Sequence, residues 1–192
     1  GALVKDAEAL LDHLSLRETV FVGLSLGGLV AQGLAAKRLD AVRALVLSNT
    51  AVKIGTRESW QARIDAIRAG GMNAEAETIM TRWFSRDFLA SGAAERWRQQ
   101  VLTQPERGYI GGCHAIAGTN FYTPTSGLRL PVLGIAGSED RATPPDLVRE
   151  TTELVPGARF VLMRRTGHLP CVEQPQGFAT QLTDFLNAIG HP

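Results

Sequence analysis

The sequence predicts an α/β fold in which a mostly parallel sheet is covered by helices and carries a helical insert. Short apolar runs alternate with helix-like segments at both ends of the chain, a pattern typical of parallel strands joined by helices. The middle of the chain contains helix-like segments only, separated by pairs such as Gly70-Gly71 and Gln104-Pro105. We therefore expect a sheet core in residues 1–53 and 129–192, and a helical cap in residues 54–128.

The predicted elements follow in order along the chain. A helix over residues 4–14 precedes a strand over residues 19–24, and a helix over residues 26–37 leads to a strand over residues 41–48. The insert supplies four helices, over residues 57–69, 73–84, 93–103 and 105–117. After the insert come a strand, a helix, a strand and a closing helix, over residues 131–137, 145–154, 159–163 and 176–189. The strands are continuously apolar rather than alternating, which favours burial on both faces of the sheet.

Composition and charge exclude several classes of function. The 192 residues are 44% hydrophobic and carry a formal net charge of +1, with basic and acidic residues interspersed, so we expect one globular unit that binds no nucleic acid. The apolar runs are too short to span a membrane, and no segment resembles a signal peptide. Cys113 and Cys171 fit neither a disulfide framework nor a metal cluster. We expect a cytoplasmic protein without a metal site.

A pentapeptide of the form G-x-S-x-G, Gly23 to Gly27, stands where the first predicted strand meets the next helix. In that context it forms a nucleophile elbow, a turn that exposes the serine side chain. We expect a strained backbone at Ser25, and we expect Gly23 and Gly27 to relieve crowding against the neighbouring strand or helix. The backbone N–H of Leu26 would face negative charge that develops beside Ser25. Taken alone, the pentapeptide fits a tight turn with an inert serine equally well.

A serine hydroxyl needs a histidine base and a carboxylate that orients the base before it can act as a nucleophile. Asp140 follows the strand over residues 131–137, with Glu139 as the adjacent alternative, and His168 follows the last strand. The chain order Ser, Asp, His is the order found with this type of elbow. We therefore predict that Ser25, Asp140 and His168 are catalytic.

Several segments carry a resemblance to a known family. GLSLGGLVAQGLA, GSEDRATPP and RRTGHLPCVEQP resemble the α/β-hydrolase superfamily. Together with SWQARIDAIRAGGM, TRWFSRDF and GYIGGCHAIAGTNFY they are most similar to the 3-oxoadipate enol-lactonases of aromatic-compound catabolism. The resemblance spans nearly the whole chain. It implies an α/β-hydrolase fold, a triad of Ser25, Asp140 and His168, a small-molecule lactone substrate, and no metal or organic cofactor.

A substrate of this class carries a carboxylate, which an arginine or a cluster of N–H groups in the cap could bind. Arg63 lies one helical turn from Trp60, and Trp83 directly follows Arg82. These positions are the candidate substrate contacts, with Trp60, Arg63 and Trp83 as the predicted set. The alternative is structural, because tryptophans at helical spacing often pack a cap against a core and arginines often face water.

The sequence departs from the family pattern at its N-terminal side. The superfamily has about eight strands and a loop that supplies a second oxyanion donor, whereas four strands and no such loop are predicted here. The first strand would keep an open apolar edge. We expect N-terminal polypeptide of the same domain, or a complementary chain, to complete the unit, and we expect impaired catalysis without it.

Other functions fit the same residues. A carboxylesterase or a hydrolase of carbon–carbon bonds would share the triad with a differently lined cap, and a cofactor-free perhydrolase or haloperoxidase would depend on peroxide. The non-enzymatic alternative is an inactive hydrolase-fold fragment or binding module.

Overall fold

The computed structural model of the protein describes residues 1–191 and contains a four-stranded parallel sheet with the strand order β1-β2-β3-β4. The strands are β1 (Thr19–Leu24), β2 (Val42–Ser48), β3 (Val132–Gly137) and β4 (Arg159–Met163). Their bounds differ from the predicted bounds by at most one residue, and the predicted parallel α/β arrangement is confirmed. β1 and β4 form the two edges, and Val22 on β1 is 47% exposed.

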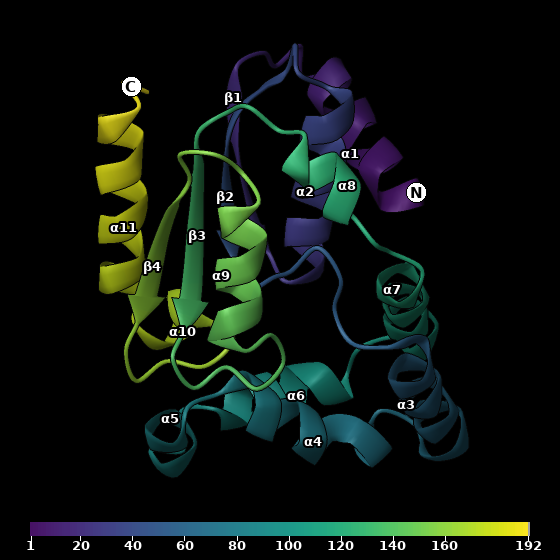
Figure 1. Cartoon of the computed structure of the whole chain (residues 1–192). Coiled ribbons are helices and arrows are strands. Elements are labelled where there is room, and N and C mark those ends of the chain that lie inside the picture. Colours follow the sequence, from purple (N-terminus) through teal and green to yellow (C-terminus); the bar gives the residue numbers. More distant parts are fainter. Residues whose placement is uncertain (192) are drawn as a thin grey trace.

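Helices cover both faces of the sheet (Figure 1). The helices α1 (Ala2–His13), α2 (Leu26–Lys37) and α9 (Pro145–Glu153) lie on one face, and α11 (Pro175–Ala188) lies on the other. Successive side chains of β2 point to opposite faces, so Leu45 and Leu47 pack with α1 and α2, while Ala44 and Val46 pack with α11. Both faces are therefore buried, as the continuously apolar strands predict.

The connection from β2 to β3 contains the helical insert. It comprises α3 (Arg57–Gly70), α4 (Asn73–Trp83), α5 (Arg86–Ala90), α6 (Glu95–Leu102), α7 (Glu106–Ala117) and α8 (Tyr122–Ser126). Figure 1 shows that α4, α5 and α6 lie beyond the arrowheads of β3 and β4, which mark the carboxyl ends of these strands. The helical insert has an apolar core of its own, which includes Ile67 on α3, Ile79 on α4 and Phe84. The insert therefore covers the edge of the sheet from which the candidate catalytic residues project.

Three short helices are absent from the sequence prediction: α5, α8 and α10 (Pro170–Glu173). Each has four or five residues, which is too short for apolar residues to recur at helical spacing. α8 falls within the predicted cap range but packs on α2, where the hydroxyl of Thr125 donates to the side-chain oxygen of Gln32 at 2.8 Å.

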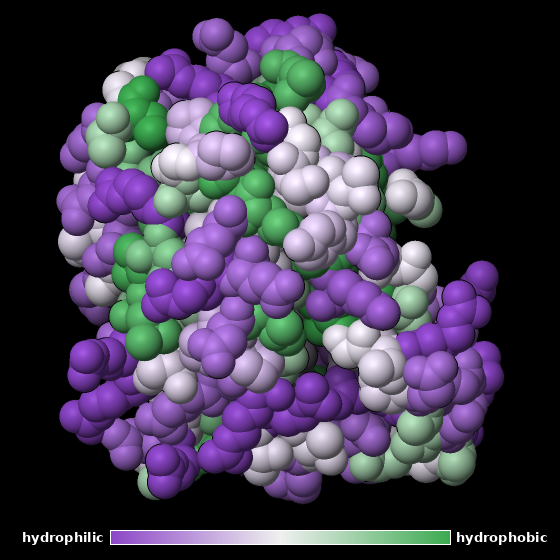
Figure 2. Space-filling model, viewed as in Figure 1, coloured by the Kyte–Doolittle hydropathy of each residue, from purple (hydrophilic) through white to green (hydrophobic). Residues whose placement is uncertain are grey.

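The face of the molecule shown in Figure 2 carries mostly hydrophilic side chains, with apolar areas interrupted by polar ones. No helix within residues 1–191 is both long enough and apolar enough to cross a membrane.

Candidate active site

Ser25 lies at the junction of β1 and α2 with a backbone φ of 55° and ψ of −118°. A positive φ is strained for a residue with a side chain and persists only where surrounding contacts enforce it. Here the N–H of Ser25 donates to the carbonyl of Ser48 at 3.0 Å. The carbonyl of Ser25 accepts from the N–H of Gly28 at 2.9 Å and from the hydroxyl of Thr50 at 2.7 Å. The predicted backbone strain at the elbow is confirmed.

Of the two glycines predicted to relieve crowding around Ser25, Gly23 does so and Gly27 does not. A Cβ atom at Gly23 would lie 2.6 Å from the carbonyl carbon of Gly27, so the predicted crowding at Gly23 is confirmed. The prediction for Gly27 is wrong, because a Cβ atom there would meet no atom within 4 Å. Instead, a Cβ atom at Gly28 would lie 2.5 Å from the Cβ atom of Thr50. Gly28 faces the chain that leaves β2 while Gly27 does not, and this difference depends on how α2 packs on the sheet.

Asp140 and His168 meet at the carboxyl edge of the sheet, in the loops that follow β3 and β4. The Nδ1 atom of His168 lies 2.8 Å from the Oδ2 atom of Asp140, and the two side chains are 4% and 0% exposed. Pairing with a carboxylate assigns the proton of the neutral imidazole to Nδ1 and leaves Nε2 as an acceptor. The backbone N–H of His168 donates to the carbonyl of Trp83 at 2.7 Å, which fixes the loop against the insert.

Four further hydrogen bonds hold the carboxylate of Asp140. Oδ1 accepts from the N–H groups of Ala142 and Thr143 at 2.7 and 3.0 Å. Oδ2 accepts from the hydroxyl of Thr143 at 2.7 Å and from the amide of Asn49 at 2.9 Å. Burial opposes ionisation of Asp140, but the hydrogen bond and the charge of His168, with the amide of Asn49 and the N–H of Thr143, hold its pKa below the usual range.

Asn49 and Thr143 are functional candidates that the sequence reasoning missed. Asn49 is fully buried with a φ of 47°, and its side-chain oxygen accepts from the hydroxyl of Ser48 at 2.9 Å. This bond turns the amide nitrogen toward Asp140. A signal was present in the sequence, because Asn49 directly follows a buried strand and so lies at the same edge of the sheet as Asp140.

Glu139, the alternative to Asp140, points elsewhere. Its carboxylate accepts from the backbone N–H of Arg86 at 3.1 Å. Glu139 thus contacts the insert, and Asp140 is the carboxylate that contacts His168.

Ser25 and His168 line one pocket of about 280 Å³ between the sheet and the insert. Every predicted substrate contact lines the same pocket: Trp60, Arg63 and Trp83. Leu26 also lines it and begins α2, so its backbone N–H has no acceptor within the helix. The remaining lining residues are Ile54, Arg82, Gln104, Gly108, Tyr109, Gly112, Cys113, Ile116, Ala142 and Thr143.

The three predicted substrate contacts also have partners within the protein. The indole N–H of Trp60 donates to the carbonyl of Ile54 at 2.6 Å, and the ring of Trp83 stacks with the ring of His168 at a centroid distance of 6.3 Å. Arg63 forms an ion pair with Glu75 at 3.1 Å.

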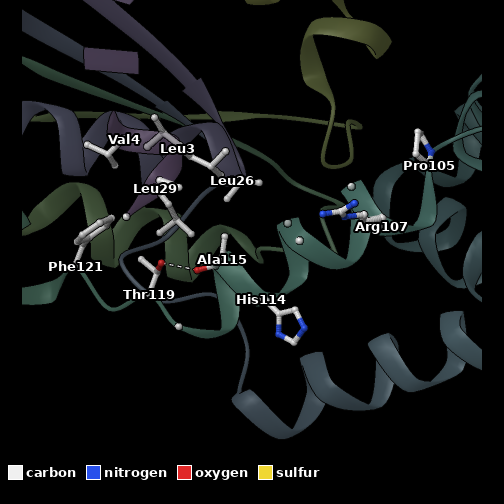
Figure 3. Close-up of a pocket in the computed structure, with 17 residues that line it drawn as sticks. Leu3, Val4, Leu26, Leu29, Pro105, Arg107, His114, Ala115, Thr119 and Phe121 are labelled. Carbon is white, nitrogen blue, oxygen red and sulfur yellow. Dashed lines mark hydrogen bonds between the residues drawn. The ribbon is translucent and has the colours of Figure 1, made fainter. Parts of the chain in front are cut away.

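A larger cavity of about 980 Å³ lies beside this pocket and shares Leu26, Gly108 and Gly112 with it. Its walls come from α1, α2 and α7 and from Phe121, and Figure 3 shows apolar side chains such as Leu29 gathered at one end. Asp140 and His168 do not line it.

No group of three or more His, Cys, Asp or Glu side chains within residues 1–191 could hold a metal ion.

A strained serine between a parallel strand and a helix, with its side chain at the carboxyl edge of the sheet, defines the class of proteins that carry a nucleophile elbow. The family described as "Alpha/beta hydrolase family" matches residues 1–181, and the chain belongs to this family.

Individual relatives are similar over most of the chain. The chain is 32% identical to 3-oxoadipate enol-lactonase 2 of Acinetobacter baylyi, over 90% of this chain and 65% of that protein, so it spans slightly less than two thirds of that relative. It is 26% identical to the pimeloyl-[acyl-carrier protein] methyl ester esterase of Vibrio cholerae, over 96% of this chain and 76% of that one. The crystal structure of the enol-lactonase from Burkholderia xenovorans LB400 superposes with a TM-score of 0.90 at 32% identity, covering 96% of this chain and 71% of that chain.

Proposed function

We propose that this chain carries the catalytic residues of a serine hydrolase that opens 3-oxoadipate enol-lactone to 3-oxoadipate in aromatic-compound catabolism. The observation that carries the proposal is that Ser25 and His168 line one pocket, while Nδ1 of His168 forms a hydrogen bond with the carboxylate of Asp140. The similarity to two enol-lactonases supports this substrate over other esters.

In the proposed reaction, Nε2 of His168 removes the proton of Ser25 as the serine oxygen attacks the lactone carbonyl. Asp140 stabilises the imidazolium that forms, and the N–H of Leu26 donates to the oxyanion. Collapse of the tetrahedral intermediate breaks the ring C–O bond and gives an acyl-enzyme. The leaving oxygen departs as an enolate and takes from His168 the proton that came from Ser25, and the resulting enol becomes a ketone. Water, activated by His168, then releases 3-oxoadipate and restores the serine.

A second oxyanion donor belongs to the proposal. Leu26 supplies one N–H group, and loss of a single donor from such a hole typically reduces kcat by about 10²–10³-fold. We propose that polypeptide outside residues 1–192, either N-terminal to them or on a complementary chain, supplies the second donor. The protein with that polypeptide should then turn over the lactone faster than residues 1–192 alone by a factor of this order.

The proposal is tested by the loss of ultraviolet absorbance of 3-oxoadipate enol-lactone. The protein should remove the absorbance, Ser25→Ala should abolish this activity, and Ser91→Ala, which alters an exposed serine of the insert, should retain it. A fluorophosphonate probe should label the wild type and the Ser91→Ala variant but not Ser25→Ala. Labelling of Ser25 without lactone turnover, in protein supplied with the complementary polypeptide, would rule out the lactonase and leave another serine hydrolase.

A carboxylesterase is the second candidate, favoured by the similarity to the methyl ester esterase of Vibrio cholerae. It would use the same residues on an acyclic ester. A panel of methyl esters separates the two, because a lactonase should have a far larger kcat/KM for the enol-lactone than for any methyl ester of similar size.

A further inference from the structure

The pocket that holds Ser25 and His168 is lined by two arginines and by no carboxylate. Arg63 and Arg82 come from different helices of the insert, α3 and α4, and both line the same space of about 280 Å³. A small pocket with excess positive charge is suited to an anion. The question is which of the two guanidinium groups is available to bind one.

Arg63, the arginine that the sequence favours, is already neutralised. Its guanidinium forms an ion pair with Glu75 at 3.1 Å, and the two side chains are only 12% and 15% exposed. It also lies over the ring of Trp60, with the guanidinium carbon 5.2 Å from the ring centre. Binding a substrate anion through Arg63 would therefore require breaking a largely buried ion pair or adding a second negative charge beside Glu75.

Arg82 has no such partner. Within residues 1–191, its side chain forms no ion pair and donates no hydrogen bond to protein. The side chain is half-buried, and burial lowers its pKa, as does the nearby positive charge of Arg63. A guanidinium stays protonated under such conditions. The carboxylates of Asp140 and Glu75 lie near enough to favour its charge, but neither forms an ion pair with it, so its N–H groups are free to bind an acceptor in the pocket. An anionic ligand would supply the missing hydrogen-bond acceptors.

The backbone around Arg82 is tied to both catalytic loops. The carbonyl of Arg82 accepts from the N–H of Arg141 at 3.3 Å, next to Asp140. The carbonyl of Trp83 accepts from the N–H of His168 at 2.7 Å. The backbone of Arg82 is therefore held against the loops that carry Asp140 and His168, so an anion bound at Arg82 would lie beside these catalytic residues.

We infer that Arg82 forms an anion subsite, which binds the free carboxylate of a substrate whose ester or lactone carbonyl lies at Ser25. This inference rests on the proposed hydrolase function and names the residue of this pocket that would bind the free carboxylate of its substrate. A guanidinium suits this role because it binds a carboxylate through two parallel hydrogen bonds. The pocket lies near the lower end of the range of about 300–1,000 Å³ for ligand sites, which favours short acyl chains.

Binding of adipate tests the subsite without requiring catalysis. Isothermal titration calorimetry compares adipate with adipamide, a neutral molecule of similar shape, on the wild-type chain and three variants. Arg82→Gln removes the positive charge, and Arg82→Lys keeps the charge but cannot donate two parallel hydrogen bonds to a carboxylate. Arg68→Gln is the control, because it removes the charge of an exposed arginine outside the pocket. Arg82→Gln leaves no protein group without a partner, and its thermal midpoint checks that it folds.

Adipate should bind the wild type more tightly than adipamide does. Arg82→Gln should weaken adipate binding by about 10- to 100-fold, the usual effect of losing hydrogen bonds to a charged group, and should leave adipamide binding unchanged. Arg82→Lys should be intermediate, and Arg68→Gln should match the wild type. The inference is overturned if adipate and adipamide bind the wild type equally or not at all, or if Arg82→Gln binds adipate as the wild type does. Equal weakening of both ligands would also overturn it, because Arg82 would then act only as a cation at the end of α4.

The lactone assay distinguishes this result from the proposed function. Adipate binding that depends on Arg82 without turnover of 3-oxoadipate enol-lactone would keep the subsite and reject the lactonase. Lactone turnover that is unaffected by Arg82→Gln would keep the lactonase and reject the subsite.

Discussion

The adjacent glycines Gly27 and Gly28 should respond in opposite directions to replacement by alanine. At Gly28 the new Cβ atom would lie 2.5 Å from the Cβ atom of Thr50, about 1 Å closer than an ordinary contact of 3.4 Å. Thr50 is fully buried and donates to the carbonyl of Ser25, so it has little room to move. At Gly27 the new atom meets nothing within 4 Å. The pair therefore isolates the packing of α2 on Thr50 from the general effect of alanine.

The magnitudes follow from packing and helix propensity. Overpacking of a buried site costs roughly 1–3 kcal/mol, and we take the upper value because Thr50 is held by its hydrogen bond. Alanine gains up to about 1 kcal/mol over glycine in a helix. The free energy of unfolding should therefore fall by about 2 kcal/mol in Gly28→Ala and rise by up to about 1 kcal/mol in Gly27→Ala. For a chain of this size, 1 kcal/mol shifts the thermal midpoint by about 2–4 °C.

Thermal unfolding followed by circular dichroism at 222 nm measures both variants. The midpoint of Gly28→Ala should fall by about 4–8 °C, and that of Gly27→Ala should equal or exceed the wild-type value. A Gly28→Ala protein as stable as the wild type, or equal losses in both variants, would refute the reasoning.

The remaining predictions concern the carboxylate of Asp140. Asp140→Asn should reduce hydrolysis of the enol-lactone by about 10⁴-fold, because Asn no longer fixes the proton of His168 on Nδ1. Loss of the equivalent carboxylate has this effect in serine proteases, and a reduction of less than tenfold would contradict the proposed role of Asp140. Because the folded pKa of Asp140 lies below the unfolded value of about 3.9, its ionisation adds stability above that pH, which is lost as the pH falls through the folded pKa. The difference in urea unfolding free energy between wild type and Asp140→Asn should therefore shrink between pH 6 and pH 3, and a constant difference would contradict the lowered pKa. Thr143→Val removes one donor to the carboxylate and should lower the unfolding free energy by about 2 kcal/mol, measured by urea titration at pH 7, whereas an unchanged value would show that the bond adds no stability.

The candidate site was partly predictable because its central residues follow directly from local sequence. Ser25 lies between two glycines at a strand-to-helix transition, and Asp140 and His168 each follow a strand. In a parallel sheet all such loops meet at one edge, so three residues far apart in sequence could be expected near one another. The residues that support them were less visible. Thr143 is ordinary in a turn sequence, and only folding brings its hydroxyl to Asp140.

By itself, the sequence determined the order and type of the long elements, the positions of the four strands to within one residue, and the placing of Ser25 at a strained turn. These features arise from periodicity and chain connectivity, which are local. Tertiary structure alone decided that Gly28 rather than Gly27 contacts Thr50, and that Arg63 is paired with Glu75 while Arg82 is not. Each of these depends on the distance between side chains on separate elements, and a linear pattern cannot encode which of two neighbouring residues faces a partner that lies far along the chain.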